Sequence, residues 1–515
     1  MTLIVLCLGL FNLFFGEVVP AGGGLGWDGV TYADITRNFP SLVENGGLSN
    51  YYAKRFLPSC VVRVMLLASG SSFDNPDIVV AFRIYNICLM CLATLIWKRI
   101  ADTLCLSNSG RWLGFSSLFL NFNCSKVMFY DPVLTDSTAL LAGLLLLLAY
   151  LQRSTFLLFL ITILASFAWQ IVGFCGFLLL LLPRCNGPTT LDASRCSGWT
   201  FSTNQLKLYL KVGWVSVSCL ALIGIIVSKH LDSLLPMERI IKIVQNHGIS
   251  WCLLRIGFWG GPFLTGVPSL LGVSIAIVML CRPPLVLREA LDSMKRGGTT
   301  GVLAAAGAVG VPWVIVNMIS NPSVPNATGV GGILGVMFFP PIGKVLLPLV
   351  GLAAFWGPMV LVLATRWGAF CREAQALGLG FVAVIALNLP LGLATEPRYV
   401  TLAWPFAVLG GVMVMERSPV SKGFQWAFGV LTVLYAQFWL KINLAPWVGG
   451  DFDGLLEFPK QIFFMHYGFW MSDWAYLFYL VAGSCSLIWL WRTNGDGGNV
   501  AHKKQPSVCC RIPRL

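Results

Sequence analysis

Asp28 is the first residue of the chain whose type and position could do chemistry. It follows an apolar run, residues 3–15, in the stretch GWDGVTYADITRNF. Tyr32, Ile35 and Phe39 recur there at i, i+3 and i+7, which predicts a short amphipathic helix with its apolar face in lipid or protein. A carboxylate at the start of such a helix can cap free backbone N–H groups. At a membrane–water boundary it can also act as a general base, and the two interpretations are compatible.

Two further stretches carry basic residues. Lys54 and Arg55 stand in YYAKRFLPSCVVR, in the same loop as Asp28. They are either snorkelling side chains or a clamp for phosphate, whose geometry a guanidinium matches. Glu396 and Arg398 stand in TEPRY, between two apolar runs. They form a local ion pair, or Arg398 reaches a lipid-linked phosphate.

Two acids lie in the turn FYDPVLTDS, at the mouth between two apolar runs. Acidic residues at membrane depth are costly and tend to be functional. At the edge, Asp131 and Asp136 cost less, and turn or cap formation is an equal alternative. Asp131 precedes a proline, which favours an extended turn conformation.

The sequence contains no pattern typical of a metal or nucleotide site. None of its four histidines (His230, His247, His466 and His502) forms a paired motif, and its sixteen cysteines show no zinc spacing. We therefore expect no metal, no cofactor and mostly free core thiols. The absence of a P-loop disfavours an ATP-driven pump.

The composition indicates a membrane protein. Of 515 residues, 57% are hydrophobic and 11% are charged, too few charges to cover a soluble core of this size. We predict an all-α polytopic transmembrane helical bundle of about 11 to 14 spans. Residues 1–491 form one transmembrane domain, with a first outer loop at about 17–77, and residues 492–515 form a basic tail. The candidate spans are residues 3–15, 78–97, 112–129, 133–151, 156–168, 171–182, 208–227, 263–280, 302–319, 345–365, 376–393, 400–415, 424–440 and 476–490.

Charge predicts the orientation of these spans. The net charge is +13, and the basic residues gather in alternate connections when both termini are cytoplasmic. We assign the excess to cytoplasmic loops and expect no nucleic-acid partner. The sequon at Asn326 then falls on the outer side, as do Asp28, Arg55, Asp131 and Arg398. A basic cytoplasmic tail follows the last span.

Taken together, these motifs resemble the GT-C superfamily of polytopic membrane glycosyltransferases. The matching features are Trp27-Asp28-Gly29 with Tyr32, a later Tyr-x-x-x-Arg-x-x-Pro stretch, the DPVLTD turn and the Glu-Pro-Arg-Tyr edge. Their arrangement is most similar to the mannosyltransferase-like branch. The motif matches are confined to about the first 140 residues and to residues 396–399.

The resemblance implies an activity and a set of roles. A polyprenyl-phosphate sugar would be the donor, and a glycan, lipid or protein hydroxyl the acceptor, with inversion at the sugar carbon. Asp28 would be the catalytic base. Arg55, Lys54 and Arg398 would face the donor phosphate, and Asp131, Asp136, Tyr32 and Glu396 would orient the acceptor or sugar. Many relatives have two adjacent acids in the first loop. Here the nearest second acid is Asp34, which a helix would point elsewhere.

The resemblance also implies a location, and two other functions stay open. The protein would lie in the endoplasmic reticulum membrane of a eukaryote, or otherwise in a plasma or inner membrane. The main alternative is a multi-pass transporter or lipid flippase. Three features favour it: Arg83 and Lys126, which lie within or near spans, and a break at FFPPIGK. A scaffold subunit without activity is the other.

Overall fold

The computed structural model describes residues 1–184, 262–281, 283–324, 346–394, 396–418, 420–443 and 473–495. Within these ranges every regular element is helical, which confirms the all-α prediction. The candidate span 208–227, the sequon at Asn326, the FFPPIGK break, most of the loop 441–473 and the tail beyond residue 495 lie outside the described residues.

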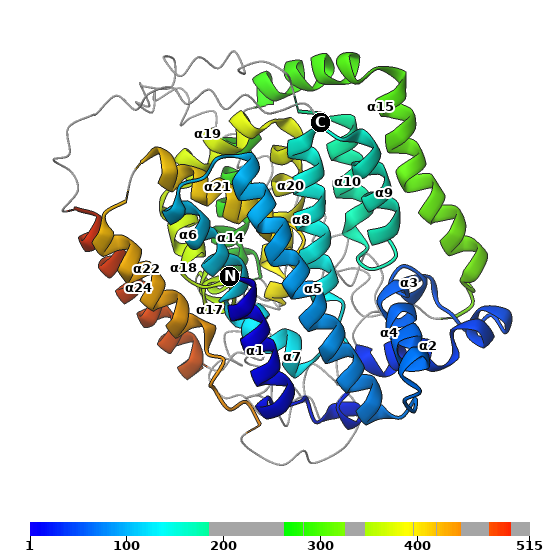
Figure 1. The fold of residues 1–515 in the computed structure, drawn as a ribbon. Helices are drawn as coiled ribbons and strands as arrows, with labels where there is room; N and C mark the ends of the chain where they lie inside the picture. The colour runs from blue at the N-terminus through cyan, green and yellow to red at the C-terminus, as the bar shows by residue number, and fades with distance from the viewer. Residues whose placement is uncertain are drawn as a thin grey trace.

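Two long helices form the centre of the molecule. Helix α5 (Asn75–Thr103) packs along α8 (Asp136–Gln152), as Figure 1 shows. Helix α1 (Thr2–Phe15) packs on α5, and α9 (Thr155–Ala165) packs on α8. Helix α10 (Ile171–Leu181) then joins α9 to α15 (Pro283–Ile319) and α20 (Leu379–Asn388). The core between them is apolar and fully buried, and it includes Trp97, Tyr150 and Phe119.

The remaining helices cover the other side of α8 and α20. Helix α21 (Trp404–Arg417) packs on α6 (Asn108–Phe119), α8 and α19 (Trp367–Leu377). Gly357 divides the predicted span 345–365 into α17 (Leu347–Trp356) and α18 (Pro358–Thr365), because its φ of +79° interrupts the helix. Helix α14 (Pro262–Cys281) contacts α19 and α20, and α22 (Lys422–Ala436) pairs with α24 (Asp473–Gly495).

Only some of the predicted spans correspond to helices long enough to cross a membrane. In the described residues, three helices are long and apolar enough to cross a membrane: Asn75–Thr103, Gly298–Ile319 and Ala475–Thr493. Most other candidate spans are shorter apolar helices. The candidate span 112–129 is broken into α6 (Asn108–Phe119), a π-helical turn η2 (Asn123–Val127) and α7 (Met128–Tyr130). The break has a local cause, since the Asn121 amide bonds the Ser117, Leu118 and Cys124 backbone.

The first long loop folds into helices of its own. They are the short turn η1 (Ala21–Gly23), α2 (Asp28–Glu44), α3 (Asn50–Ala53) and α4 (Leu57–Ser69). Figure 1 shows α2, α3 and α4 grouped at one end of the bundle, beside the end of α15. The predicted amphipathic helix is therefore present and longer than predicted. Its apolar face, with Tyr32 and Ile35, packs on α4 and α5.

Candidate functional site

Asp28 lies at the start of α2, where the chain makes a tight approach to another loop. Trp27 occupies the N-cap position, so Asp28 is the first helical residue and no capping hydrogen bond of its side chain is among the described ones. Gly26, with φ +75°, precedes it, and a Cβ on Gly26 would lie 2.8 Å from both carboxylate oxygens of Asp131. Only glycine fits this contact without strain. The GWDG stretch is thus held directly against the Asp131 carboxyl.

The turn that carries Asp131 and Asp136 is held in place by α5. Asn86 donates hydrogen bonds of 2.9 Å to the backbone oxygens of Met128 and Pro132, and it accepts one from Ser137 Oγ at 2.5 Å. Asp131 and Asp136 are 2% and 3% exposed. Their Oδ1 atoms are buried without a hydrogen-bond partner among the described residues. Such groups are costly unless something else, such as a ligand, satisfies them.

Arg398 enters the same region from the opposite half of the chain. The short helix η6 (Pro397–Val400) is fixed by Trp356 Nε1, which donates to the Pro397 oxygen at 3.0 Å. Arg398 donates through Nε to Glu396 and through Nη1 to Asp136 Oδ2 at 3.3 Å. Its charge is therefore shared by two carboxylates. A glycine at residue 143 permits this approach, since a Cβ there would lie 2.2 Å from the Leu402 oxygen.

Arg55 is the second arginine of the site, and its surroundings differ. It is 9% exposed, and its guanidinium lies over the rings of Tyr51, at 4.4 Å, and Trp169, at 5.2 Å. Nη1 donates to the Tyr32 hydroxyl at 3.2 Å, and Nε is buried without a hydrogen-bond partner in the described part of the chain. None of the ion pairs between described residues involves Arg55. A stacked, buried guanidinium with a vacant donor is suited to receive an anion.

Electrostatic coupling shows which predicted residues converge. The charge of Asp28 acts on Asp131, Arg55, Arg398 and Tyr32, and Glu396 acts on Asp131 and Asp136. These seven predicted residues therefore form one cluster, hereafter the candidate site: Asp28, Tyr32, Arg55, Asp131, Asp136, Glu396 and Arg398. Lys54 is the exception. It is half-buried, burial lowers its pKa, and no charge of the candidate site contributes to that shift.

The Asp131 carboxyl has the most perturbed environment of the site. Burial raises its pKa; Arg398 lowers the pKa, and the nearby charges of Asp28, Asp136 and Glu396 raise it, to about 8 in total. A carboxyl of this kind gains or loses a proton near neutral pH. No group of three or more His, Cys, Asp or Glu side chains in the described residues is arranged to hold a metal ion.

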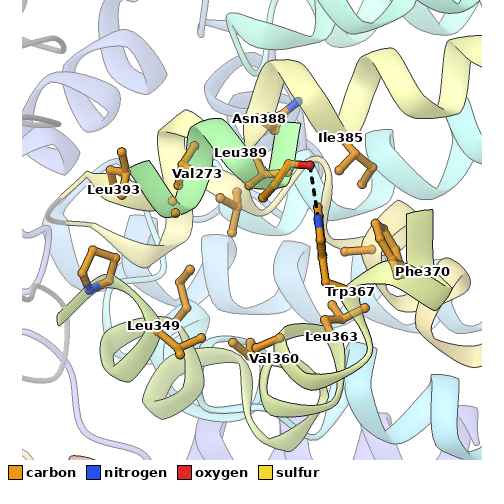
Figure 2. Close-up of a pocket in the computed structure, with 18 of the residues that line it drawn as sticks. Val273, Leu349, Val360, Leu363, Trp367, Phe370, Ile385, Asn388, Leu389 and Leu393 are labelled. Atoms are coloured by element: carbon orange, nitrogen blue, oxygen red, sulfur yellow. Dashed lines mark hydrogen bonds between the residues drawn. The ribbon is translucent and has the colours of Figure 1, made fainter. Parts of the chain in front are cut away.

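An apolar cavity of about 480 Å³ lies in the bundle next to the site. Its lining includes Leu393 and Val400, which flank the Glu396–Arg398 segment in the sequence, as well as Trp367 and Phe370. Figure 2 shows its wall, where the Trp367 indole donates to the Ala276 oxygen at 3.2 Å. Asn388 is the one side-chain amide among the described residues that line it. The cavity is suited to an apolar chain and is unsuited to a hydrated ion.

Sequence reasoning did not assign a role to a second buried group of charges near the site. Arg83 donates to the backbone oxygens of Leu13, Gly16, Glu17 and Phe129, at 2.7 to 3.4 Å. Lys126 Nζ pairs with Glu17 at 3.2 Å, and Glu17 also accepts the backbone N–H groups of Ile442 and Asn443. We call Glu17, Arg83 and Lys126 the anchoring network.

The anchoring network bears on the transporter alternative. Arg83 and Lys126 are the two ionisable residues that suggested a polar path through the membrane. In the structure their donors go to structural acceptors at the end of α1, in Glu17 and in α7. A helical sequence signal for this role existed, because Arg83 and Asn86 stand three residues apart on α5 and both reach residues 128–132.

Comparisons with known proteins add no relative. No protein-family model matches the chain, and neither a curated protein nor a solved structure is similar to it.

Proposed function

We propose that the protein is a multi-pass membrane glycosyltransferase of the GT-C type, resembling the mannosyltransferase-like branch. It moves a hexose, such as mannose, from a polyprenyl-phosphate donor to an acceptor hydroxyl of a glycan, lipid or protein. The reaction takes place on the luminal or periplasmic face and inverts the sugar carbon. The full set of about 11 to 14 spans and the cytoplasmic termini belong to this proposal. The membrane is that of the endoplasmic reticulum in a eukaryote, or otherwise a plasma or inner membrane.

One observation supports the proposal most strongly. Two buried acids and Arg55, an arginine without a carboxylate partner among the described residues, belong to one cluster, and each has a buried atom without a hydrogen-bond partner there. The vacant atoms are Arg55 Nε, Asp131 Oδ1 and Asp136 Oδ1. A cation suits the donor phosphate, and carboxylates suit the hydroxyls of a sugar or acceptor. A transporter would need its ionisable groups along a path, whereas these gather at one end of α8.

The roles within the site follow from its charges. Arg55 has no carboxylate partner in the ion pairs of the described residues, so we assign it the donor phosphate. Arg398 donates hydrogen bonds to Glu396 and Asp136, so it holds these two acids in position. It would contact the phosphate only in addition to Arg55. Lys54 is left without a role at the phosphate.

Asp28 is the general base in this proposal. Its carboxylate is half-buried at the start of α2, beside the buried acids and open to an incoming acceptor. It removes the acceptor's hydroxyl proton while the oxygen attacks the sugar carbon from the face opposite the phosphate, which inverts the configuration. The leaving polyprenyl phosphate is already an anion, so its departure needs no acid.

The apolar cavity gives the donor's chain a place. Its lining residues Leu393 and Val400 flank the Glu396–Arg398 segment in the sequence, which supports a headgroup at the site with its chain in the cavity. Burying an apolar chain stabilises binding by about 25 cal/mol per Å².

The test is transfer of labelled sugar from a panel of polyprenyl-phosphate donors, in membranes that contain the wild type or Asp28→Asn. Asparagine keeps the shape of the side chain but cannot accept the proton. We expect transfer by the wild type with one donor and a loss on the order of 10²-fold or more in the variant. The matched control is Asp34→Asn on the same helix, where Asp34 accepts a hydrogen bond from Asn38 at the surface.

Two results would contradict the proposal. Equal transfer by the wild type and Asp28→Asn would show that Asp28 is not the base. No transfer from any donor, with the protein inserted and monodisperse, would remove the glycosyltransferase assignment and favour a transporter.

A further inference from the structure

Asp131 is a buried acid that the mechanism above does not use as an acid or base. It is 2% exposed, and its Oδ1 has no hydrogen-bond partner among the described residues. Its backbone N–H donates to the Val127 oxygen at 3.0 Å, which fixes the residue at the end of α7. A buried carboxylate without a donor is unfavourable in its charged form, so the site holds this residue against a cost in stability.

The neighbours of Asp131 are mostly negative. Asp28 faces it from α2, Asp136 from the start of α8, and Glu396 and Arg398 from the segment around η6. Tyr130 precedes it in α7, and burial, followed by the Asp131 charge, raises the pKa of Tyr130. Arg398 is the cation of the group, and its hydrogen bonds to side chains go to Glu396 and Asp136. Three carboxylates and one shared arginine leave Asp131 prone to hold a proton.

Asp131 also contacts the loop that carries the proposed base. Both its carboxylate oxygens lie 2.8 Å from the point where a Cβ on Gly26 would stand, two residues before Asp28. A Cβ on Gly29, the residue after Asp28, would lie 3.1 Å from Val133 Cβ. The two loops therefore meet on both sides of Asp28, and the charge of Asp28 is near enough to help raise the pKa of the buried Asp131 carboxyl, after burial itself.

We propose that Asp28 and Asp131 act as a proton-handling pair, in which Asp28 takes the acceptor's proton and Asp131 holds it after the transfer. This inference rests on the proposed function. In the step, the acceptor O–H bond breaks and its proton moves to Asp28 and on to Asp131. The acceptor oxygen forms the new bond to the sugar carbon, and the carbon–phosphate-oxygen bond breaks with its electron pair on the leaving phosphate. Asp28 returns as a carboxylate, and the proton later leaves Asp131 for water.

The pair accounts for the position of each acid. Two carboxylates close together do not both ionise easily, so they titrate as a unit and share a proton. Because burial and the neighbouring acids raise the pKa of Asp131 to about 8, this carboxyl retains a proton well at neutral pH. It receives a proton only when it is ionised. We therefore expect kcat/KM to rise as the pH rises through about 8.

The first arm of the test is infrared spectroscopy of the purified protein, which needs no substrate. A protonated carboxylic acid has its own C=O stretching band, and we expect one such band to disappear as the pH rises through about 8. The band should be missing in Asp131→Asn. It should titrate at lower pH in Asp28→Asn, since a negative neighbour is removed while Asp131 stays in place. Asp34→Asn is the control and should leave it unchanged.

The second arm is the pH profile of sugar transfer. Asp131→Asn should lower kcat on the order of 10- to 100-fold and remove the rise near pH 8, with the KM for the donor unchanged. A purely structural Asp131 would leave the shape of the profile unaltered, and that result would overturn the proposal.

The two arms separate this inference from the proposed function. A band that does not move in Asp28→Asn would overturn the pair even if transfer is observed. Absence of transfer by the wild type would overturn the function, and the pair with it, while the infrared titration would still report whether the two carboxyls interact. If Asp131→Asn does not fold, the Asp28→Asn shift decides the question alone.

Discussion

Two groups of buried charges lie at the same end of this bundle, and they are built differently. In the anchoring network, Glu17 accepts from Lys126, Ile442 and Asn443, and Arg83 donates to the ends of α1 and α7. No atom of these three side chains is among the buried unsatisfied atoms of the described residues. In the candidate site, Arg55, Asp131 and Asp136 each retain one such atom. The first group holds the loops together, whereas in the second we propose that a bound ligand supplies the missing partners.

The two groups also differ in the direction of their pKa shifts. Burial raises the pKa of Glu17, but the hydrogen bonds from two backbone N–H groups and Lys126 lower the pKa by more, so the net shift is downward. The pKa of Asp131 goes up, to about 8, because burial and three acids outweigh Arg398. A carboxylate supplied with donors stabilises the fold, whereas one without donors costs stability and is kept for another reason. The sign of a residue's charge therefore does not distinguish the two groups, whereas the number of hydrogen-bond donors that each carboxyl receives does.

The largest loss of stability from a single substitution should come from the anchoring network. Arg83→Met leaves the Leu13, Gly16, Glu17 and Phe129 oxygens without this donor, and unfolding should become easier by on the order of 3 kcal/mol. The measurement is denaturant unfolding in mixed micelles. Arg99→Met, the same change at an exposed position of α5, should stay within about 0.5 kcal/mol. Equal stability of the two variants would remove the structural role of Arg83.

Arg55→Gln should reduce activity much more than stability. Losing a charge-assisted hydrogen bond to phosphate costs about 1.5–3 kcal/mol, so kcat/KM for the donor should fall roughly 10- to 100-fold. The loss should lie mainly in KM, because the phosphate is bound before the reaction. The free energy of unfolding should change by less than about 1 kcal/mol, as no carboxylate is left unpaired. A variant that unfolds easily but transfers normally would reverse the comparison.

The pH dependence of stability should separate the two acids by sign. Asp131 has a raised folded pKa, so the folded state binds more protons, and stability falls as the pH rises from about 4 to about 8, by up to about 1.4 kcal/mol per pH unit. Asp131→Asn should remove this fall. Glu17 has a lowered folded pKa, so its contribution is present above its unfolded pKa and is lost as the pH falls through the folded value. Glu17→Gln should remove this loss of stability at acid pH and leave the fall that Asp131 causes at higher pH. Denaturant unfolding at a series of pH values measures both.

The smallest effect is expected at Lys54. Its charge does not act on the carboxyls of the candidate site, and it lies beside Arg55 in the sequence. Lys54→Gln should change transfer by less than about twofold and stability by less than about 0.5 kcal/mol. A loss comparable to that of Arg55→Gln would place Lys54 at the phosphate after all.

Parts of the fold could be read from the sequence because they depend on local patterns. The apolar runs predicted helices at α1, α5, α8, α10 and α14 with ends displaced by a few residues. The run 112–129 was predicted as one span and is three pieces, since the Asn121 side chain competes for the backbone. Helix α4 was not predicted at all, because its 13 residues are short for a span and lie in a loop rich in polar residues.

The sequence by itself determined which residue types are available: an acid after Trp27, two acids around a proline turn, and an arginine in each of two polar edges. Only the tertiary structure decided how they combine. It brought Gly26 onto Asp131, joined Arg398 to Asp136, and gave Arg55 and Lys54 different surroundings. The reason is physical: local periodicity fixes helices, but burial and the number of hydrogen-bond donors around a charge arise only when distant segments pack.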